Sequence, residues 1–344
     1  MAWVLVPCRG CDWRAGIAMV DGRLMQVLRS LRLGPECAGR RLDQALAQAW
    51  PEFSRGRVQQ WIEAGQVLVD GAPRRCRDRV WGGEAVSLDA ALVADERDSP
   101  QAIPLAIVHE DEALLVIDKP AGLVVHPAAG NPDGTLLNAL LHHAPTLAAL
   151  PRGGIVHRLD KDTSGLLVVA KTLQAHCSLV EQLRRRTVHR EYRALVVGEL
   201  VAGGSVTAPI GRHPTQRTRM AVVADGRPAH TRFRVLERYP GHCLLGVELE
   251  TGRTHQIRVH LTHVHHPLVG DPVYGGRPRP PKGCSPLLAA AIQGFPRQAL
   301  HAIRLGLAHP ETGRAMAWEV PMAPDLGALL ELFRQEATGG TDST

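Results

Sequence analysis

The stretch HRLDKDTSG, residues 157–165, places the carboxylate of Asp160 close to two cations. Arg158 comes two residues before it, and Lys161 follows it directly. A nearby cation keeps a carboxylate ionised, and an ionised carboxylate can act as a nucleophile or as a general base. The same residues also fit a turn aspartate that is only neutralised by its neighbours. The stretch alone leaves both interpretations open.

Familiar aspartate and nucleotide-binding motifs do not account for Asp160. Phosphatases of the haloacid-dehalogenase type require D-x-D-x-T or D-x-D-x-V, and here Thr163 and Ser164 follow Asp162 in the wrong order. Aspartic proteases require D-T-G or D-S-G, whereas DTSG carries one residue more. The sequence contains no P-loop G-x-x-x-x-G-K-[ST], so no nucleotide cofactor is expected.

Metal binding is not expected either. Histidines crowd at positions 260, 263, 265 and 266, but their spacing matches no zinc template, and Cys8 and Cys11 form a C-x-x-C without a second pair. The seven cysteines are scattered and odd in number, which indicates reduced thiols and a cytoplasmic protein. No run approaches the roughly 18 apolar residues of a membrane span, so no membrane association is expected.

The charge of the chain favours a polyanionic partner such as RNA. The net charge is +6 and the pI is near 9.2. Only four of the 40 basic residues are lysine, which indicates a general bias toward arginine. The position of each arginine therefore matters more than the total.

Residues 38–90 are predicted to form a small RNA-binding module. RRLDQALAQAW and SRGRVQQWIEAG have the apolar spacing of two short helices, and QVLVDGAP is typical of a strand that leads into a turn. Basic side chains gather at the start of the second helix and just beyond that turn: Arg55, Arg57, Arg74 and Arg75. Helix N-termini favour phosphate, so these arginines are candidate RNA contacts, with a solvated charged face as the alternative.

Three segments are predicted to lie outside the folded domains. Residues 1–30 lack periodicity, which indicates a flexible, disordered extension or a start codon assigned too far upstream. Residues 91–102 are acidic and polar, as expected of a linker. Residues 336–344, in EATGGTDST, are predicted to be a disordered tail.

Residues 103–335 are predicted to form a larger α+β domain. Strand-like segments recur through it, among them ALLVID, GLVVHP, LLVVAK, HTRFRVLERY and CLLGVELE. Helical segments interrupt them near 134–143, 173–185 and 255–264. Because strands and helices alternate unevenly, the pattern predicts a mixed sheet rather than a regular parallel one.

Four stretches together resemble the RluA-type family of pseudouridine synthases: IDKPAGLVVHP, HRLDKDTSG, EYRALVVGE and TGRTHQIRVHLTHVHHPLVGDPVYG. The resemblance runs from about Leu105 to Pro321, and residues 38–90 resemble the RNA-binding domain named after ribosomal protein S4. It implies an α+β catalytic domain with a mixed, mainly antiparallel sheet, preceded by an S4-like domain. It also implies isomerisation of uridine to pseudouridine in RNA without a cofactor.

The resemblance carries family roles onto residues of this chain. Asp160 matches the essential aspartate, Arg258 the arginine that pairs with it, and Tyr192 the tyrosine that stacks on uracil. Arg158 fits a base-flipping role. Further matched residues are expected to bind the substrate: His157, Thr163, His255 and Gln256. Four more arginines are expected to contact phosphates: Arg217, Arg219, Arg277 and Arg279.

Ordinary structural roles remain open for the same side chains. Arg158 also fits a counter-charge, Tyr192 a strand residue half-buried in the core, and Arg258 a surface position on an amphipathic helix. The chemistry is open as well, because Asp160 fits both a nucleophile and a base that leads to a glycal-like intermediate.

HPAAGNPDGTLLNALLHH, GRHPTQRTRMAV and DPVYGGRPRPPKG further resemble a subgroup that modifies the loop of helix 69 in 23S rRNA. The expected partner is then 23S rRNA in the pre-ribosomal large subunit, bound by a monomer. Two alternatives remain: a sibling synthase that acts on tRNA or another rRNA site, and a non-catalytic RNA-binding protein of ribosome assembly.

Overall fold

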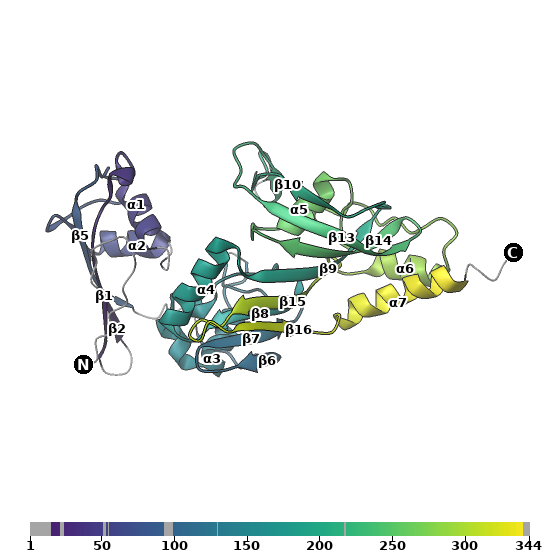
Figure 1. Cartoon of the computed structure of the whole chain (residues 1–344), viewed down its shortest axis with the longest axis horizontal. Helices are drawn as coiled ribbons and strands as arrows, with labels where there is room; N and C mark the ends of the chain where they lie inside the picture. The colour runs from purple at the N-terminus through teal and green to yellow at the C-terminus, as the bar shows by residue number, and fades with distance from the viewer. Residues whose placement is uncertain are drawn as a thin grey trace. The chain divides into compact units, whose positions relative to one another are not determined.

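A computed structural model describes residues 15–20, 24–50, 53, 55–92, 99–128, 130–216 and 218–339. The chain divides by compactness into two units (Figure 1). The first comprises residues 1–99 with 144–153, and the second comprises residues 100–143 with 154–344. No helix among the described residues is both long and apolar enough to cross a membrane.

The first unit contains two short helices and a five-stranded sheet with the strand order β1-β2-β5-β3-β4. Its elements are β1 (Ala15–Val20), β2 (Leu24–Arg32), the 3-10 turn η1 (Pro35–Cys37), α1 (Leu42–Ala49), α2 (Arg55–Glu63), β3 (Val67–Val69), β4 (Ala72–Pro73) and β5 (Ala85–Leu92). The predicted apolar helix faces are buried in one cluster, in which Leu46 of α1 and Trp61 of α2 lie with Val86 of β5.

The N-terminal segment corrects the sequence-based prediction. β1 pairs with β2, and β2 pairs antiparallel with β5 from Met25 to Arg32. Residues 15–20 and 24–30 therefore belong to the sheet rather than to a disordered extension, because their backbone groups find partners there. The rest of the predicted extension, residues 1–14 and 21–23, lies outside the described residues.

Arg55, a predicted RNA contact, has a structural role in this unit. The buried carboxylate of Asp43 accepts hydrogen bonds from Arg55 Nη2 at 2.7 Å, Arg41 Nε at 3.1 Å and Gln59 Nε2 at 2.6 Å. Burial alone would raise the pKa of Asp43, but these bonds outweigh it and lower the pKa. Arg55 thus ties α2 to the start of α1, while its side chain is still 45% exposed.

The second unit is built on a nine-stranded sheet with the order β10-β13-β14-β9-β15-β8-β7-β6, and β16 pairs with β15. Its strands are β6 (Ile107–Glu110), β7 (Leu114–Lys119), β8 (Ser164–Ala170), β9 (His189–Val197), β10 (Gly204–Thr207), β13 (His230–Tyr239), β14 (His242–Leu249), β15 (Leu300–Ala308) and β16 (Ala315–Glu319). β11 (Ile210–Arg212) and β12 (Met220–Val222) form a separate pair. β8 runs parallel to β15, and the other neighbours in the described sheet are antiparallel.

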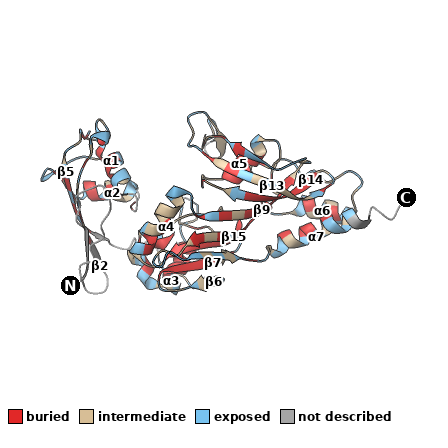
Figure 2. Ribbon diagram, viewed as in Figure 1, coloured by how far each residue is buried: buried red, intermediate tan, exposed pale blue. Residues whose placement is uncertain are grey.

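Helices cover this sheet: α3 (Leu136–His143), α4 (Leu173–Arg185), α5 (Gln256–His263), α6 (Pro286–Gly294) and α7 (Pro324–Gly339). Leu179 of α4 packs with Val168 of β8 and Leu305 of β15 in one apolar cluster. Phe333 of α7 packs in another with Leu195 and Leu244. Buried residues accordingly line β7 and β15 (Figure 2). These features confirm the predicted α+β class with a mixed, mainly antiparallel sheet.

Most predicted elements of this unit are confirmed, and one is wrong. The predicted helix at 173–185 has the bounds of α4, and HTRFRVLERY has those of β13. GLVVHP, residues 122–127, forms turns instead of a strand. The carbonyls of Val124 and Val125 accept hydrogen bonds from the N–H groups of Leu136 and Leu137. This segment therefore provides hydrogen-bond partners for the first N–H groups of α3 rather than pairing with a sheet edge.

The predicted linker and tail are also shorter than expected. β5 extends to Leu92, and the Gln101 side chain accepts a hydrogen bond from the Gly134 N–H at 2.8 Å. Both ends of the 91–102 segment therefore belong to folded structure, and residues 93–98 lie outside the described residues. α7 continues to Gly339, into the segment predicted to be disordered, and residues 340–344 lie outside the described residues.

Asp111 gives this unit a predictable sensitivity to acid. Its carboxylate accepts the N–H groups of Ala113 and Leu114 and faces Nε2 of His109 at 2.9 Å and of His309 at 3.2 Å. Burial alone would raise the pKa, but the hydrogen bonds from His109 and the backbone outweigh it and lower the pKa of Asp111 to about 2. A carboxyl with a lowered pKa stabilises the fold above its unfolded value of 3.8, and this contribution is lost as the pH falls toward about 2.

We therefore expect Asp111→Asn to lower the free energy of unfolding by on the order of 1 kcal/mol at neutral pH. The difference between wild type and variant should disappear as the pH falls from about 4 to about 2. Urea unfolding at a series of pH values measures it. A difference that stays constant with pH would contradict the assignment.

Candidate active site

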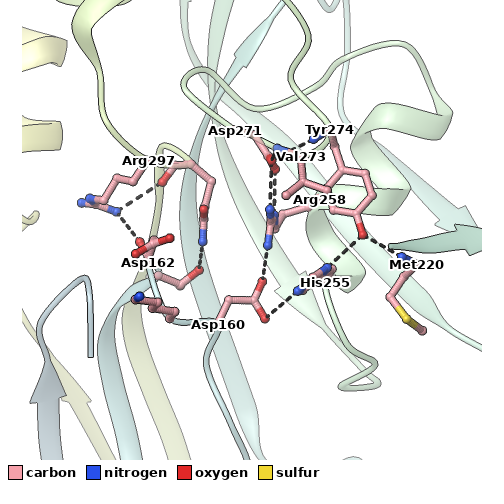
Figure 3. Close-up of polar contacts among 12 residues, drawn as sticks. Asp160, Asp162, Met220, His255, Arg258, Asp271, Val273, Tyr274 and Arg297 are labelled. Carbon is pink, nitrogen blue, oxygen red and sulfur yellow. Dashed lines mark hydrogen bonds and ion pairs between the residues drawn. The ribbon is translucent and has the colours of Figure 1, made fainter. Parts of the chain in front are cut away.

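Asp160 lies in a tight turn just before β8. The N–H of Thr163 donates to the carbonyl of Asp160 at 3.1 Å, which closes the turn. The next two carbonyls are held from outside: Lys161 O accepts from Lys119 Nζ at 2.9 Å, and Asp162 O accepts from Arg297 Nη1 at 3.1 Å. With its backbone held on each side, the turn presents the Asp160 carboxylate in a fixed direction (Figure 3).

Lys119 is a fully buried cation beneath this turn. Besides Lys161 O, its ammonium group donates to the carbonyls of Pro120 and Leu123, so three backbone oxygens satisfy it. Burial lowers the pKa of Lys119 to about 7, although the charges of Asp162 and Asp160 oppose the shift. The lysine of IDKPAG thus positions the turn, a role that sequence analysis did not assign.

The end of the motif, Ser164-Gly165, joins the turn to the sheet. Ser164 pairs with His301 and Gly165 with Ala302, which is the parallel contact between β8 and β15. Gly165 has φ +111°, and a β-carbon there would lie 2.2 Å from the carbonyl oxygen of Ala302. Only glycine permits this close approach, which fixes the turn on the strands below it.

The carboxylate of Asp160 pairs with Arg258 across the site. Arg258 Nη1 donates to Asp160 Oδ2 at 3.1 Å, while its Nε and Nη2 donate to both oxygens of Asp271 at 2.7 and 2.9 Å. Burial alone would lower the pKa of Arg258, but the two carboxylates outweigh it and raise the pKa. The bidentate pair with Asp271 sets the plane of the guanidinium, which then aims its remaining donor at Asp160.

Asp271 is itself fixed by the backbone that follows it. Its carboxylate accepts the N–H groups of Val273 and Tyr274, each at 2.9 Å. Burial would raise the pKa of Asp271, but the bonds from Arg258 outweigh it and lower the pKa. Arg258 is therefore no surface residue of an amphipathic helix, which decides the alternative left open by the sequence.

A histidine and a tyrosine lie on the other side of Asp160. Nε2 of His255 is 4.0 Å from Asp160 Oδ1, and its Nδ1 is 2.9 Å from the hydroxyl of Tyr274 (Figure 3). That hydroxyl accepts the N–H of Met220 at 2.9 Å, which favours donation of its own proton to Nδ1. The ring of His255 then carries its proton on Nε2, toward Asp160. Burial is the main cause that lowers the pKa of His255, so the neutral ring is favoured.

We expect Tyr274→Phe to lower the rate of the expected reaction, pseudouridine formation, about fivefold. This factor corresponds to the loss of one hydrogen bond of about 1 kcal/mol. Without the hydroxyl, His255 loses the partner that fixes its tautomer and orientation. Single-turnover rates measured against pH would check this result. An unchanged rate and pH profile would show that the contact has no part in the reaction.

Tyr192 is buried and Arg158 is exposed, and their roles in base stacking and base flipping stay predictions. Tyr192 is buried on β9, where burial raises the pKa of its phenol and the charge of Asp160 adds to the shift. Arg158 is exposed two residues from Asp160, and its charge acts on His255.

Gln256 and Thr163, two predicted substrate-binding residues, are buried and form hydrogen bonds within the protein. The amide of Gln256 is buried and makes four hydrogen bonds within the chain, with Thr251, Arg253, His230 and Thr231. The buried hydroxyl of Thr163 accepts from Gln298 Nε2. No donor or acceptor of the Gln256 amide is left for a substrate, so its predicted substrate contact is corrected. The predicted substrate contact of Thr163 stays a prediction.

His157 supports the strand behind the turn. Its Nε2 accepts the N–H of Val168 at 3.1 Å, which requires the ring proton to be on Nδ1. Burial, together with the charge of Arg190, lowers the pKa of His157 to about 3. A neutral ring bonded to β8 has a positioning role. Its Nδ1 has no hydrogen-bond partner among the described residues, and the predicted substrate contact stays a prediction.

The predicted phosphate-binding arginines fall into several groups. Arg74, Arg75, Arg277 and Arg279 are exposed, Arg57 is half-buried, and Arg217 lies outside the described residues. Arg277 and Arg279 line a small cavity of about 160 Å³ that also borders Asp271. Arg219 is instead engaged with the site: Nη1 donates to Gln216, Nη2 donates to the carbonyl of Val273, and the guanidinium lies over the Tyr274 ring.

The crowded histidines have ordinary structural contacts where the structure shows them. His260 is buried between Thr231 and the carbonyl of Ala208, at 2.9 and 3.0 Å. Among the described residues, no group of three or more His, Cys, Asp or Glu side chains is arranged to hold a metal ion.

Comparison with known proteins accounts for this architecture. A family model described as RNA pseudouridylate synthase matches residues 113–263, and an S4 domain model matches residues 40–84. A human structure, RNA Pseudouridylate Synthase Domain Containing 4, aligns with a TM-score of 0.53 and 27% identity over 67% of this chain and 93% of that one.

Curated relatives cover most of the chain. Ribosomal large subunit pseudouridine synthase D of Pseudomonas aeruginosa is 56% identical over 310 residues, which is 90% of this chain and 97% of the relative. The protein of the same name from Escherichia coli K12 is 54% identical over 299 residues, or 87% of this chain and 92% of the relative. The chain therefore belongs to the RluA-type family of RNA pseudouridine synthases. It is an isomerase that carries an S4 domain before its catalytic domain.

Proposed function

We propose that this protein converts uridine to pseudouridine in 23S rRNA of the large ribosomal subunit, most specifically in the loop of helix 69. The relatives above, named for the large ribosomal subunit, support the ribosomal substrate. The observation that carries the proposed chemistry is the Asp160 carboxylate, held by Arg258 and open on its other oxygen toward His255. The proposal includes a monomer bound to the RNA.

The reaction breaks the bond from ribose C1′ to N1 of uracil and forms one from C1′ to C5, with the proton on C5 moved to N1. No electron donor or acceptor is consumed. Asp160 serves either as nucleophile or as the base that removes a ribose proton. Arg258 holds and orients the carboxylate through the hydrogen bond from its Nη1.

The target base must leave its stack before Asp160 can reach the sugar. Extrusion costs a few kcal/mol, and an inserted side chain offsets part of that cost. Arg158 is the exposed candidate for this insertion, and the ring of Tyr192 is the surface on which the extruded uracil stacks. The neutral Nε2–H of His255 then lies near the reacting sugar and the carboxylate.

The test uses the purified protein and a synthetic helix 69 stem-loop. After incubation the RNA is digested to nucleosides, and chromatography separates pseudouridine from uridine, which has the same mass. Pseudouridine in the loop with wild type supports the proposal. If tRNA or another rRNA segment is modified and the helix 69 loop is not, in RNA or in ribosomal particles, the proposed target is wrong. If no RNA is modified, a non-catalytic role in ribosome assembly replaces it.

A further inference from the structure

A group of arginines meets at one end of the large sheet, beside Tyr192. β9 and β13 both run antiparallel to β14, so the starts of β9 and β13 lie next to the end of β14. Arg186 and Arg190 lie at the start of β9, Arg227 just before β13, and Arg253 just after β14. The Nε of Arg253 donates to the carbonyl of Pro228 at 3.1 Å, which joins the segments of Arg253 and Arg227.

Arg190 is the buried member of this group. Its side chain is only 8% exposed, and its Nε has no hydrogen-bond partner among the described residues. Nη2 makes a long bond of 3.3 Å to the carbonyl of Leu249. A β-carbon on Gly252 would lie 2.9 Å from Nη1, so the guanidinium packs directly on the backbone that leads to Arg253. A buried cation with an unused donor is costly unless a further acceptor arrives.

The negative charge beside this group is small. Among the described residues, the carboxylate of Glu250 is in contact with this group. It is shared by Arg186 at 3.4 Å, His230 at 2.7 Å and Arg232 at 2.8 Å. Within the described structure, Arg190 and Arg253 bond through their side chains only to carbonyl oxygens, and Arg227 makes no side-chain hydrogen bond. Burial lowers the pKa of Arg253, and the charges of Arg227 and Arg186 lower it further.

The position of the group relates it to the substrate. Arg190 and Tyr192 alternate to the same buried face of β9, about 7 Å apart along the strand. The charge of Arg190 acts on both Tyr192 and His157. An RNA strand whose base rests on Tyr192 carries one phosphate per nucleotide past this point, and phosphate oxygens match the forked donors of arginine.

We propose that Arg190, Arg227 and Arg253 form a binding site for one phosphodiester group of the RNA strand next to the extruded uridine. This site deepens the proposed function and rests on it. It adds residues to the RNA interface that the sequence motifs did not indicate. Its ligand is the backbone rather than a base, so it secures the strand at the site without choosing the sequence.

The test uses the RNA that the wild-type protein modifies. Binding of this RNA is measured for the wild type, for two variants and for a control variant. Arg227→Gln removes a side chain that makes no hydrogen bond to the described residues, so it is not expected to disturb the fold. Arg227→Gln with Arg253→Gln should weaken binding about tenfold. The slope of log affinity against log salt should become shallower by about 0.7 for the lost phosphate contact. Arg238→Gln is the matched control, because Arg238 is exposed and lies at the other end of β13, bonded to the carbonyls of Leu200 and Val201.

A neutral methylphosphonate, placed at one linkage of the RNA at a time, identifies the phosphate. At one linkage, the neutral group should weaken RNA binding to the wild type and to the control variant but not to the double variant. If every position affects wild type and double variant equally, or if the double variant binds with the salt slope of the control, the inference is overturned while the proposed function stands. If wild type modifies no RNA at all, the proposed function fails and this inference falls with it.

Discussion

Replacing Asp160 with asparagine is expected to lower the rate of pseudouridine formation by about 10⁴-fold, the upper end of what one positioned general base contributes. Asparagine keeps the shape of the side chain but can neither attack the sugar nor accept its proton. The carboxylate has one oxygen on Arg258 and the other toward His255, and the nearby Asp271 has both of its oxygens bonded to Arg258. Single-turnover nucleoside analysis with enzyme in excess measures the change.

The control for this experiment is Asp133→Asn, which neutralises an exposed carboxylate outside the site. Its rate should equal that of wild type. Asp160→Asn should still bind the RNA, because the arginines that contact the backbone are unchanged. A variant that keeps more than about one tenth of the wild-type rate would show that Asp160 is neither nucleophile nor base, since either role contributes at least about 10²-fold.

Asp271→Asn is expected to have the second largest effect, on stability and activity together. The carboxylate is buried and fixes Arg258 through two hydrogen bonds, so its loss leaves a buried guanidinium without its main partner. Removing one member of a buried ion pair costs about 3–5 kcal/mol. The same change frees Arg258 to rotate, so the Asp160 carboxylate loses its fixed direction and the rate falls as well. Urea unfolding and single-turnover rates measure the two effects.

Asp325→Asn provides a matched comparison. Asp325 also makes a bidentate pair with a buried arginine, Arg297, but its side chain is 41% exposed. Arg297 also keeps its bonds to backbone carbonyls, so the cost should be on the order of 1 kcal/mol. Equal losses of stability in the two variants would contradict the special role of Asp271.

The sequence predicted the fold where local patterns are strong. The apolar spacing of residues 173–185 and of HTRFRVLERY determined the bounds of α4 and β13, because each segment buries one face regardless of its partners. The strands at the N-terminus were missed because β2 is stabilised by β5, about 60 residues further along the chain. Neither segment of that pair shows by itself what it will contact.

The candidate site was predictable only in part, for a similar reason. The pairing of Asp160 with Arg258 came from family resemblance and is present in the structure. Asp271, Tyr274 and Lys119 were missed, although DPVYG and IDKPAG were noticed, because their roles arise from contacts made after folding. Gln256 was wrongly assigned to the substrate, since a motif shows that a polar residue is needed but not whether a ligand or the backbone uses it.

The long sequence separation of the contacts around Asp160 also bears on when the enzyme becomes competent during its own synthesis. Arg258 lies 98 residues after Asp160, and Arg297 lies 135 residues after Asp162, whose carbonyl it holds. β15, the strand against which Gly165 rests, is translated later still. A nascent chain that ends before this strand has the HRLDKDTSG motif but not the strand on which Gly165 rests. We therefore expect the enzyme to become competent only after β15 has been synthesised, and chains that end before this strand to leave RNA unmodified.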